Sequence, residues 1–416
     1  MKITTDNTPQ GKVTPLGIIP NEWKILPLQK VGKIYSGGTP DTKEPSYWNG
    51  DILWCTPSDI TKLKTRFITN TNQKITQLGL KNSSATLLPP GCILVCTRAT
   101  IGNAAITLKE TSTNQGFKNI KPTKDINVDW LFYCIASNKH RLVQLGGGST
   151  FLEVSKKDFE KFKIAIPPLP EQQKIAEIIN TWDKFIEKQS QLIEKLELRK
   201  KGLMQQLLTA KKRLPGYSDS WKRIKYYNIL TETHRSLKWD ENELYDLISV
   251  RRRSGGVFHR ESLYGYEIKT KNLRPALEGD FLISKMQIVH GASGVVPKQL
   301  SGMKISGSYI ALVAKDPQEL NINYFNLWSQ MPLFYRQTFI SSNGVHIEKM
   351  TFDLETFMSL SMDLPPIEEQ NKIVTIISSA CKDIELAKQK LELFRQQKHG
   401  LMQQLLTGKK RVNINN

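Results

Sequence analysis

Two long stretches of this chain place apolar residues at alternating intervals of three and four positions. One follows Pro167-Pro168 and the other follows Pro365-Pro366, and prolines suit the start of a helix. This spacing is typical of a coiled-coil seam. A helix from Glu171 to Thr209 would hold 39 residues and measure roughly 58 Å at ~1.5 Å per residue. The apolar positions are Ile175, Ile178, Trp182, Phe185/Ile186, Leu192/Ile193, Leu196, Leu203 and Leu207, then Ile373, Ile376, Ala380, Ile384, Ala387, Leu391, Phe394, Leu401 and Leu405.

These two stretches are copies of one another at an offset of 198 residues. Gly202–Thr209 recurs letter for letter at Gly400–Thr407, and residues 167–213 share 25 identities with residues 365–411 in 47 ungapped pairs. The equally long stretches before them show little likeness, apart from Trp-Lys pairs at their starts. A recent duplication would have kept all parts similar. We favour the interpretation that the matched segments meet identical partners or each other, while the divergent segments meet different targets.

The divergent segments, residues 16–166 and 214–364, read as α+β globular units. Short β-type runs alternate there with Gly, Pro and Asn, and one helix is expected near residues 129–143 and one near 324–339. The expected strands are 52–54, 93–95, 162–166, 281–283 and 309–313. Residues 1–15 and 412–416 are expected to be flexible tails.

Neither long helix can bury its apolar stripe alone, so the pattern predicts that the two pair antiparallel as a coiled coil. The predicted fold class is therefore α+β, with two globular domains joined by two long antiparallel coiled-coil helices in a pseudo-twofold internal repeat. In that arrangement the two domains would lie at opposite ends of a rod.

The charge of the chain favours polyanionic partners. Lysine and arginine number 59 against 39 acidic residues, giving a net charge of +20 and an isoelectric point near 9.6. Nucleic acid is the simplest such partner. No apolar run approaches the ~20 residues of a membrane-spanning helix, and Met1–Asp6 begins no signal peptide. We expect a cytoplasmic protein that does not associate with membranes, whose five cysteines are reduced; zinc binding by four of them is the alternative.

No catalytic site or metal site is evident in the sequence. Gly146–Thr150 lacks the Gly-Lys-Ser/Thr ending of a phosphate-binding loop, and no His-Glu-x-x-His occurs. A nuclease-like set can be assembled from Asp246, Glu267 and Lys269, although such a triplet arises easily by chance in a charge-rich chain. Two alternatives therefore stay open, a standalone DNA nuclease and a coiled-coil adaptor with no DNA role, and the +20 charge gives no support to the second.

Two basic features are candidates for DNA contact. Arg251, Arg252 and Arg253 precede Ser-Gly-Gly, a flexible turn suited to phosphate or guanine contact. Arg98 follows a predicted strand in Thr97–Gly102, from where it could enter a groove. Solvated surface charge and a glycine-dependent turn are the respective alternatives.

Near the start of the chain, Ser36-Gly37-Gly38-Thr39-Pro40 is followed by Tyr47-Trp48-x-Gly50-Asp51-Ile52-x-Trp54. This segment resembles the opening of the target recognition domain in one family, the specificity subunits of type I restriction–modification enzymes. Gly91-x-Ile93-Leu94, Ala99–Gly102 and Asn114-Gln115-Gly116-Phe117 resemble its middle. The segment from Pro167 into Gly202–Thr209 resembles its spacer helix. The second domain departs from the pattern, since only Gly279–Leu282 and Gly291 echo the middle motif.

The resemblance implies a non-catalytic reader of an asymmetric, two-part DNA target. Residues 16–166 and 214–364 would be target recognition domains 1 and 2, and residues 167–213 and 365–411 would be the spacer helices. Double-stranded DNA, two methyltransferase subunits and two restriction subunits are the implied partners. This chain would bind no cofactor itself, with S-adenosylmethionine, ATP and magnesium on the partners. The residues expected to contact DNA are Thr39, Lys43, Arg98, Thr100, Arg251, Arg252, Arg253 and Lys285. The residues expected to dock partner subunits are Gln205, Gln206, Leu207, Gln403, Gln404 and Leu405.

Overall fold

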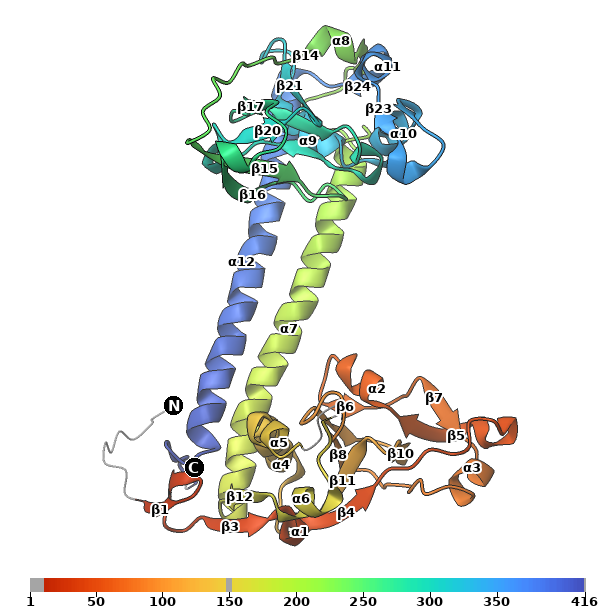
Figure 1. Cartoon of the computed structure of the whole chain (residues 1–416), viewed down its shortest axis with the longest axis vertical. Coiled ribbons are helices and arrows are strands. Elements are labelled where there is room, and N and C mark those ends of the chain that lie inside the picture. The colour runs from red at the N-terminus through yellow and green to blue at the C-terminus, as the bar shows by residue number, and fades with distance from the viewer. Residues whose placement is uncertain (1–10, 147–151, 415–416) are drawn as a thin grey trace. The chain divides into compact units, whose positions relative to one another are not determined.

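The computed structural model describes residues 11–146 and 152–414, and Figure 1 labels its elements. The chain divides into two compact units. The first unit comprises Met1–Ser190 and Lys390–Asn416, and the second comprises Gln191–Gln389. Each unit therefore contains one α+β domain together with part of both long helices, α7 (Leu169–Leu207) and α12 (Ile367–Leu405).

The remaining elements of the first unit are short. Its strands are β1 (Lys12–Thr14), β2 (Gly17–Ile19), β3 (Lys24–Pro27), β4 (Gly32–Ser36), β5 (Trp48–Cys55), β6 (Phe67–Ile68), β7 (Gln73–Ile75), β8 (Ile93–Cys96), β9 (Ala104–Thr107), β10 (Thr111–Thr113), β11 (Phe117–Pro122) and β12 (Lys163–Ile166). Its helices are α1 (Leu28–Val31), α2 (Pro57–Thr61), α3 (Gln77–Lys81), α4 (Val128–Ser137), α5 (Lys139–Gln144) and α6 (Lys156–Lys161), with the 3₁₀ turn η1 (Pro45–Tyr47).

The second unit has a similar set. Its strands are β13 (Lys222–Lys225), β14 (Leu230–Glu232), β15 (Leu244–Val250), β16 (Val257–Tyr264), β17 (Leu273–Pro275), β18 (Phe281–Ser284), β19 (Ser293–Val295), β20 (Lys304–Ser306), β21 (Tyr309–Ala314), β22 (Ser342–Asn343), β23 (Thr351–Phe352) and β24 (Ser361–Leu364). Its helices are α8 (Tyr226–Ile229), α9 (Ile322–Trp328), α10 (Pro332–Ile340) and α11 (Leu354–Ser359), with 3₁₀ turns η2 (Gly265–Glu267), η3 (Ile288–His290), η4 (Lys298–Leu300) and η5 (Ile347–Lys349).

The two domains share a topology although their sequences differ. The main sheet has strand order β4-β11-β8-β9-β6 in the first unit and β14-β21-β18-β19 in the second. A second sheet contains a parallel pair in each, β5 with β10 and β15 with β20. An antiparallel pair closes each domain beside the long helices, β3 with β12 and β13 with β24. The α+β class is confirmed, and the second domain has the fold of the first.

Two predicted helices are wrong in their extent. The helix expected at residues 129–143 is interrupted at Asn138, whose side chain donates a hydrogen bond to the Cys134 carbonyl oxygen 2.8 Å away, so α4 ends there and α5 begins. The helix expected at 324–339 is split by Pro332, which begins α10 because proline lacks the N–H needed to continue α9.

The described part of the expected N-terminal tail is structured. Residues 12–14 form β1, which pairs antiparallel with β2. A sequence of three residues carries too little periodicity to predict such a strand. Residues 1–10, 147–151 and 415–416, which include most of the glycine-rich segment Gly146–Thr150, lie outside the described residues.

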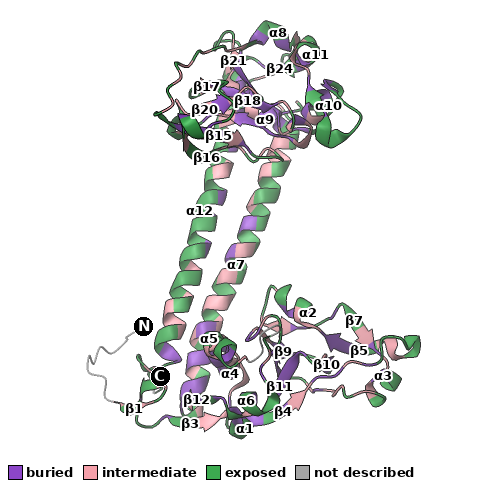
Figure 2. Ribbon diagram, viewed as in Figure 1, coloured by how far each residue is buried: buried purple, intermediate pink, exposed green. Residues whose placement is uncertain are grey.

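The long helices run antiparallel within each unit. In the first unit Glu171 of α7 contacts Arg411 beyond the end of α12, whereas Asp183, later in α7, contacts the earlier Lys398. In the second unit Glu197 of α7 pairs with Lys388 of α12 at 2.7 Å, and Arg213 pairs with Glu369. Along both helices, buried and exposed residues alternate, as Figure 2 shows.

The helix boundaries and the seam differ slightly from the prediction. α7 begins at Leu169 and ends at Leu207, two residues earlier than expected. Ile179 and Ile377 are fully buried instead of the expected Ile178 and Ile376, because each packs into the core of the adjacent domain. Phe185 is half exposed. No helix within the described ranges has the length and apolarity that a membrane crossing requires.

The repeated Glu-Gln pairs anchor each helix to its domain in the same way. The Gln172 side chain accepts a hydrogen bond from the Asn127 backbone N–H and donates to the carbonyl oxygens of Asp125 and Pro167. In the second unit, Gln370 repeats all three contacts with Asn321, Glu319 and Pro365. Both glutamines are buried. A buried amide must be satisfied, so these contacts preserve the residue in both copies.

The repeated Trp, Glu and Arg residues complete an equivalent junction. The Glu369 carboxylate accepts hydrogen bonds from Trp221 Nε1 at 3.1 Å and from Arg213 Nε at 3.0 Å. In the first unit, Glu171 accepts from Trp23 at 2.9 Å and from Arg411 at 2.8 Å. In each unit, the arginine comes from one copy of the repeat and the carboxylate from the other. The interpretation that the matched segments meet each other is confirmed.

Candidate nucleic-acid interface

One turn in the first unit brings together two residues predicted to contact DNA. In Asn114-Gln115-Gly116, the Asn114 side chain accepts a 2.9 Å hydrogen bond from the Gly116 N–H. The Gln115 side chain is hydrogen-bonded to the Thr39 hydroxyl. The Gly116 carbonyl oxygen accepts from the Thr97 N–H at 2.7 Å, directly before Arg98. The Gly-Gly-Thr-Pro loop and the Arg98 turn therefore meet at residues 114–116.

Arg98 stands on a tight turn between β8 and β9. Ala99 has φ +55° and Gly102 has φ +81°, so the turn uses the left-handed region twice. A Cβ at Gly102 would lie 2.7 Å from Lys139 Cγ, which requires glycine there. The Arg98 side chain is 47% exposed and forms a 2.6 Å ion pair with Glu153. The turn presents the guanidinium at the surface, where a phosphate or a base edge can compete with the carboxylate.

Glu153 also faces a buried lysine. Lys118 Nζ lies 3.9 Å from the Glu153 carboxylate, and the Lys118 side chain is only 8% exposed. Burial lowers the pKa of Lys118, while Glu153 acts in the opposite direction. One carboxylate thus balances a buried cation and an exposed one.

The other two candidates in this domain differ in accessibility. Lys43 is exposed, and its backbone N–H donates to Asp41 Oδ1 at 2.9 Å. The Thr100 hydroxyl is buried and has no hydrogen-bond partner among the described residues. Thr100 therefore does not present its hydroxyl to a ligand in this conformation, because the tight turn directs it inward.

The arginine cluster of the second unit lies on the loop between β15 and β16. Arg253 and Ser254 have φ +58° and +54°, and their N–H groups donate to the carbonyl oxygens of His290 and Gly291 at 2.7 and 2.8 Å. These bonds hold the loop in its left-handed conformation against η3.

The three arginines of that loop are exposed but have different surroundings. Arg251 lies 3.9 Å from the centroid of the Phe258 ring, a cation–π contact. Arg252 donates to Gln287 at 2.6 Å and pairs with Glu348 at 2.9 Å. Lys285 is half-buried, in the same loop as Gln287. The structure therefore places the cluster and Lys285 on adjoining loops of one domain.

Asp246 and Glu267 of the nuclease-like triplet each bind side chains or backbone groups outside the triplet. Asp246 accepts a hydrogen bond from Ser262 and lies 3.5 Å from His259. The Glu267 carboxylate accepts from the Tyr264 N–H at 2.8 Å, which caps η2, and Lys269 is exposed. Within residues 11–146 and 152–414, no group of three or more His, Cys, Asp or Glu side chains is arranged to hold a metal ion.

The comparisons with known proteins find relatives for the first domain. Residues 20–198 match the family model "Type I restriction modification DNA specificity domain". The matched residues cover the first α+β domain and most of α7. Over 192 residues the chain is 36% identical to the type I restriction enzyme MjaIX specificity subunit of Methanocaldococcus jannaschii, covering 45% of this chain and 44% of that protein. It is 31% identical to the EcoR124I/EcoR124II specificity subunit of Escherichia coli over 189 residues, covering 43% of this chain and 45% of that protein. The chain thus aligns with less than half the length of each of these two relatives.

The likeness of fold extends beyond residues 20–198. A solved type I restriction–modification S subunit from M. genitalium matches with a TM-score of 0.55 over 94% of this chain and 98% of its own, at 12% identity. At that identity the match shows a shared fold, including the second domain and both long helices.

The docking residues predicted near the helix ends fall into two groups. Leu207 and Leu405 are buried in the two domain cores, so for these residues a direct docking role is wrong. Leu207 belongs to the core of the second unit and Leu405 to the core of the first. The four glutamines are exposed. Gln403 lies 3.0 Å from His399, and none of the other three has a side-chain hydrogen bond within the described ranges.

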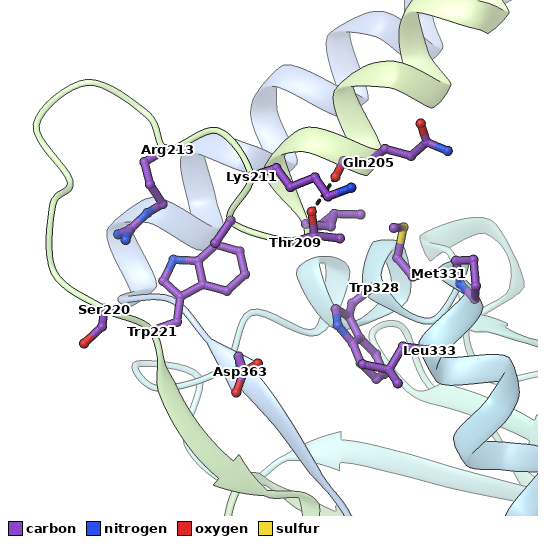
Figure 3. A pocket seen from close by; sticks show the side chains of 13 residues that line it. Gln205, Thr209, Lys211, Arg213, Ser220, Trp221, Trp328, Met331, Leu333 and Asp363 are labelled. Atoms are coloured by element: carbon purple, nitrogen blue, oxygen red, sulfur yellow. Dashed lines mark hydrogen bonds between the residues drawn. The ribbon is translucent and has the colours of Figure 1, made fainter.

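A cavity of about 760 Å³ lies beside Gln205 in the second unit. Its walls include Trp221, Trp328, Met331 and Leu333, with Lys211 at the rim, as Figure 3 shows. The Thr209 hydroxyl donates to the Gln205 carbonyl oxygen at 2.6 Å, the contact dashed in the same view. The exposed glutamine thus borders an apolar depression of its own domain.

Sequence reasoning missed several residues of these sites. Gln115 was within a motif that resembles the family, but its bond to Thr39 depends on the fold. Glu153 and Lys118 belong to no motif, and their pairing joins positions 35 residues apart. The sequence shows that both residues are charged, but it does not show that their side chains form an ion pair.

Proposed function

We propose that this chain is the DNA sequence-specificity subunit of a type I restriction–modification complex. The observation that carries the proposal is that two domains of one topology present different basic loops above identical anchoring contacts. A shared scaffold with divergent loops suits recognition of two different DNA half-sites. The match of residues 20–198 to a DNA specificity domain and the +20 charge support the same conclusion.

The DNA contacts would be made from the loops of each domain. In the first domain the candidates are Thr39 and Arg98, which meet at the Asn114–Gly116 turn, and the exposed Lys43. In the second domain they are Arg251, Arg252, Arg253 and Lys285. Arginine can bind guanine bidentately in the major groove, and lysine contacts to phosphate fix the register. Two unlike readers in one chain would recognise an asymmetric target in two parts.

The exposed glutamines would dock the partner subunits. Contacts within the chain explain why the buried residues are identical in the two copies of the repeat. They do not explain the identity of the four exposed glutamines, Gln205, Gln206, Gln403 and Gln404. Identical exposed positions at two equivalent sites suit two copies of one partner, the methyltransferase subunit that binds S-adenosylmethionine. Two restriction subunits with ATP and magnesium would join the complex. The chain itself would be non-catalytic and cytoplasmic.

A domain exchange tests the proposal. Residues 16–166 are replaced by the corresponding domain of another family member, and methylated sites are mapped after co-expression with the modification subunit. We expect one part of the target to change and the other to stay. If both parts change, or if neither does, the modular assignment is wrong.

A single substitution tests the site within the first domain. Arg98→Gln should weaken binding to the mapped target by roughly 1–3 kcal/mol, or about 5- to 150-fold, if it contacts a base. Lys62→Gln removes another exposed charge from the same domain and serves as the control. Equal losses in the two variants would show that Arg98 makes no specific contact.

A further inference from the structure

A cavity in the second unit is lined by four basic side chains. It has a volume of about 570 Å³ and lies between α7, α12 and the Arg251–Gly256 loop. Its four cations are Lys200, Lys201, Arg253 and Lys388, against the single carboxylate of Glu197. Met204 and Ile384 add apolar surface, and Gln330 and Tyr335 add polar groups.

Only one of these cations is neutralised nearby. Lys388 forms a 2.7 Å ion pair with Glu197. In the described part of the chain, Lys200, Lys201 and Arg253 have no ion pair with any acidic side chain. The Arg253 backbone is held by its bond to His290, and the neighbouring Ser254 hydroxyl lies 2.8 Å from Tyr335 Oη. The position of Arg253 in the cavity wall is thus set before any ligand binds.

At the equivalent position of the first unit, the lysine is neutralised by a carboxylate. The counterpart of Lys200 is Lys398, which forms an ion pair with Asp183. Asp183 also accepts a hydrogen bond from Tyr133 and lies 3.7 Å from Arg66. The residue that corresponds to Asp183 in the second unit is Cys381, which lines the basic cavity. Because the second copy of the repeat has Cys381 in place of aspartate, Lys200 has no equivalent of the Asp183 carboxylate.

We propose that this cavity binds a backbone phosphate of the DNA duplex, with Lys200, Lys201 and Arg253 as its ligands. The inference rests on the proposed function. Duplex DNA is the favoured anion because Arg253 shares its loop with Arg251 and Arg252, so the cavity continues the basic surface already assigned to DNA. Flexible ammonium groups suit a phosphate and read no base, so the contact adds affinity without adding sequence preference. The first unit would not make this contact, because its equivalent lysine, Lys398, already forms an ion pair with Asp183.

The first experiment adds the missing carboxylate without removing a lysine. Cys381→Asp should pair with Lys200 as Asp183 pairs with Lys398. Binding of the full-length chain to labelled duplexes is measured over a range of salt concentrations, with one duplex carrying the mapped target and one a scrambled sequence. We expect affinity for both duplexes to fall by the same factor. Cys381→Ser, which adds no charge, is the matched control and should bind as the parent does.

The second experiment removes the cations. The double variant Lys200→Gln/Lys201→Gln should lower the slope of log affinity against log salt by about 0.9 for each lost contact, hence by about two. Lys398→Gln makes the same change at the equivalent position of the first unit. It should lower the melting temperature, since it breaks the pair with Asp183, but leave the salt slope unchanged.

The outcomes separate this inference from the proposed function. Unchanged slopes in Cys381→Asp and in the double variant would overturn the phosphate site while leaving sequence-selective binding intact. If the parent chain shows no salt-sensitive, sequence-selective DNA binding, the proposed function itself fails. Inorganic phosphate is titrated in parallel, and saturable binding that the double variant loses while DNA binding persists would assign the cavity to a small anion and overturn the inference.

Discussion

At the scale of single residues, two glutamates hold the repeat together. Glu171 and Glu369 are each buried and accept hydrogen bonds from one tryptophan and one arginine. Because the carboxylate comes from one copy and the arginine from the other, each glutamate closes a contact between segments far apart in the sequence. The two sites have nearly equal geometry, which makes them internal controls for one another.

Replacing either glutamate should destabilise its unit to a similar degree. Glu171→Gln and Glu369→Gln each remove a buried charge that pairs with arginine, at a cost of roughly 2–4 kcal/mol. Urea unfolding, followed separately for each unit if two transitions occur, gives the measurement. Glu22→Gln, which alters an exposed carboxylate beside Arg411, should leave stability nearly unchanged. A similar loss in that control would mean that the buried position is not the cause.

The cysteines give a second prediction at this scale. Burial raises the pKa of both Cys92 and Cys96 to about 11, so at pH 8 these thiols stay protonated and unreactive. Cys55 and Cys134 are also buried, whereas Cys381 is partly exposed. A disulfide-exchange reagent should therefore label one thiol rapidly in the native chain and all five after denaturation. Rapid labelling that persists in Cys381→Ser would contradict this assignment.

At the scale of elements, the ends of the long helices show how the copies have diverged. Three residues after the last residue of each long helix, the backbone adopts a positive φ, at Ala210 (+56°) and at Gly408 (+74°). A Cβ at Gly408 would lie 2.4 Å from Pro20 Cδ, so glycine is required there by sterics as well as by conformation. At the equivalent position of the second unit, Ala210 adopts a positive φ that is unfavourable for a residue with a Cβ.

Reciprocal substitutions test this difference. Gly408→Ala should destabilise the first unit by more than about 1 kcal/mol, since it adds a clash to an unfavourable φ. Ala210→Gly relieves the same φ and should leave the second unit unchanged or stabilise it by up to about 1 kcal/mol. Melting temperatures of the two variants provide the comparison. Equal effects would show that the contact with Pro20 is unimportant.

At the scale of the whole molecule, two continuous helices of 39 residues each contribute to both units. Under the proposed function, the length of this pair sets the gap between the two parts of the DNA target. Because the two helices pair antiparallel, a change of length in one must be matched by the same change in the other. Glu187 and Glu385 occupy equivalent positions in the two copies of the repeat, so equal insertions can be made after them.

Inserting seven residues after both Glu187 and Glu385 should preserve the apolar seam and lengthen each helix by ~10 Å. That length corresponds to about three base pairs. We expect the variant to lose the original target, or to methylate sites with a longer central gap and unchanged outer parts. Methylation mapping is the readout. A folded, assembled variant that retains the original spacing would exclude the helices as the ruler.

The sequence by itself determined the repeat, the two long helices, their antiparallel pairing and the α+β character of the divergent domains. Those features follow from local periodicity and from self-comparison, which need no knowledge of distant contacts. The sequence also placed Arg98 and the Arg251–Arg253 cluster on loops, because residues typical of turns flank them.

Only the tertiary structure decided which of these charges are free. Glu153 reaches Arg98 and Lys118, and Asp183 reaches Lys398, across separations that no local pattern reports. Leu207 and Leu405 share a motif with exposed glutamines, yet the domain cores bury them. The difference between Asp183 and Cys381 is a single letter in the alignment of the repeats. The fold brings Lys398 beside Asp183 and Lys200 into the cavity that Cys381 lines. Because an ion pair depends on distance in space, only the first of these lysines has a carboxylate partner there among the described residues.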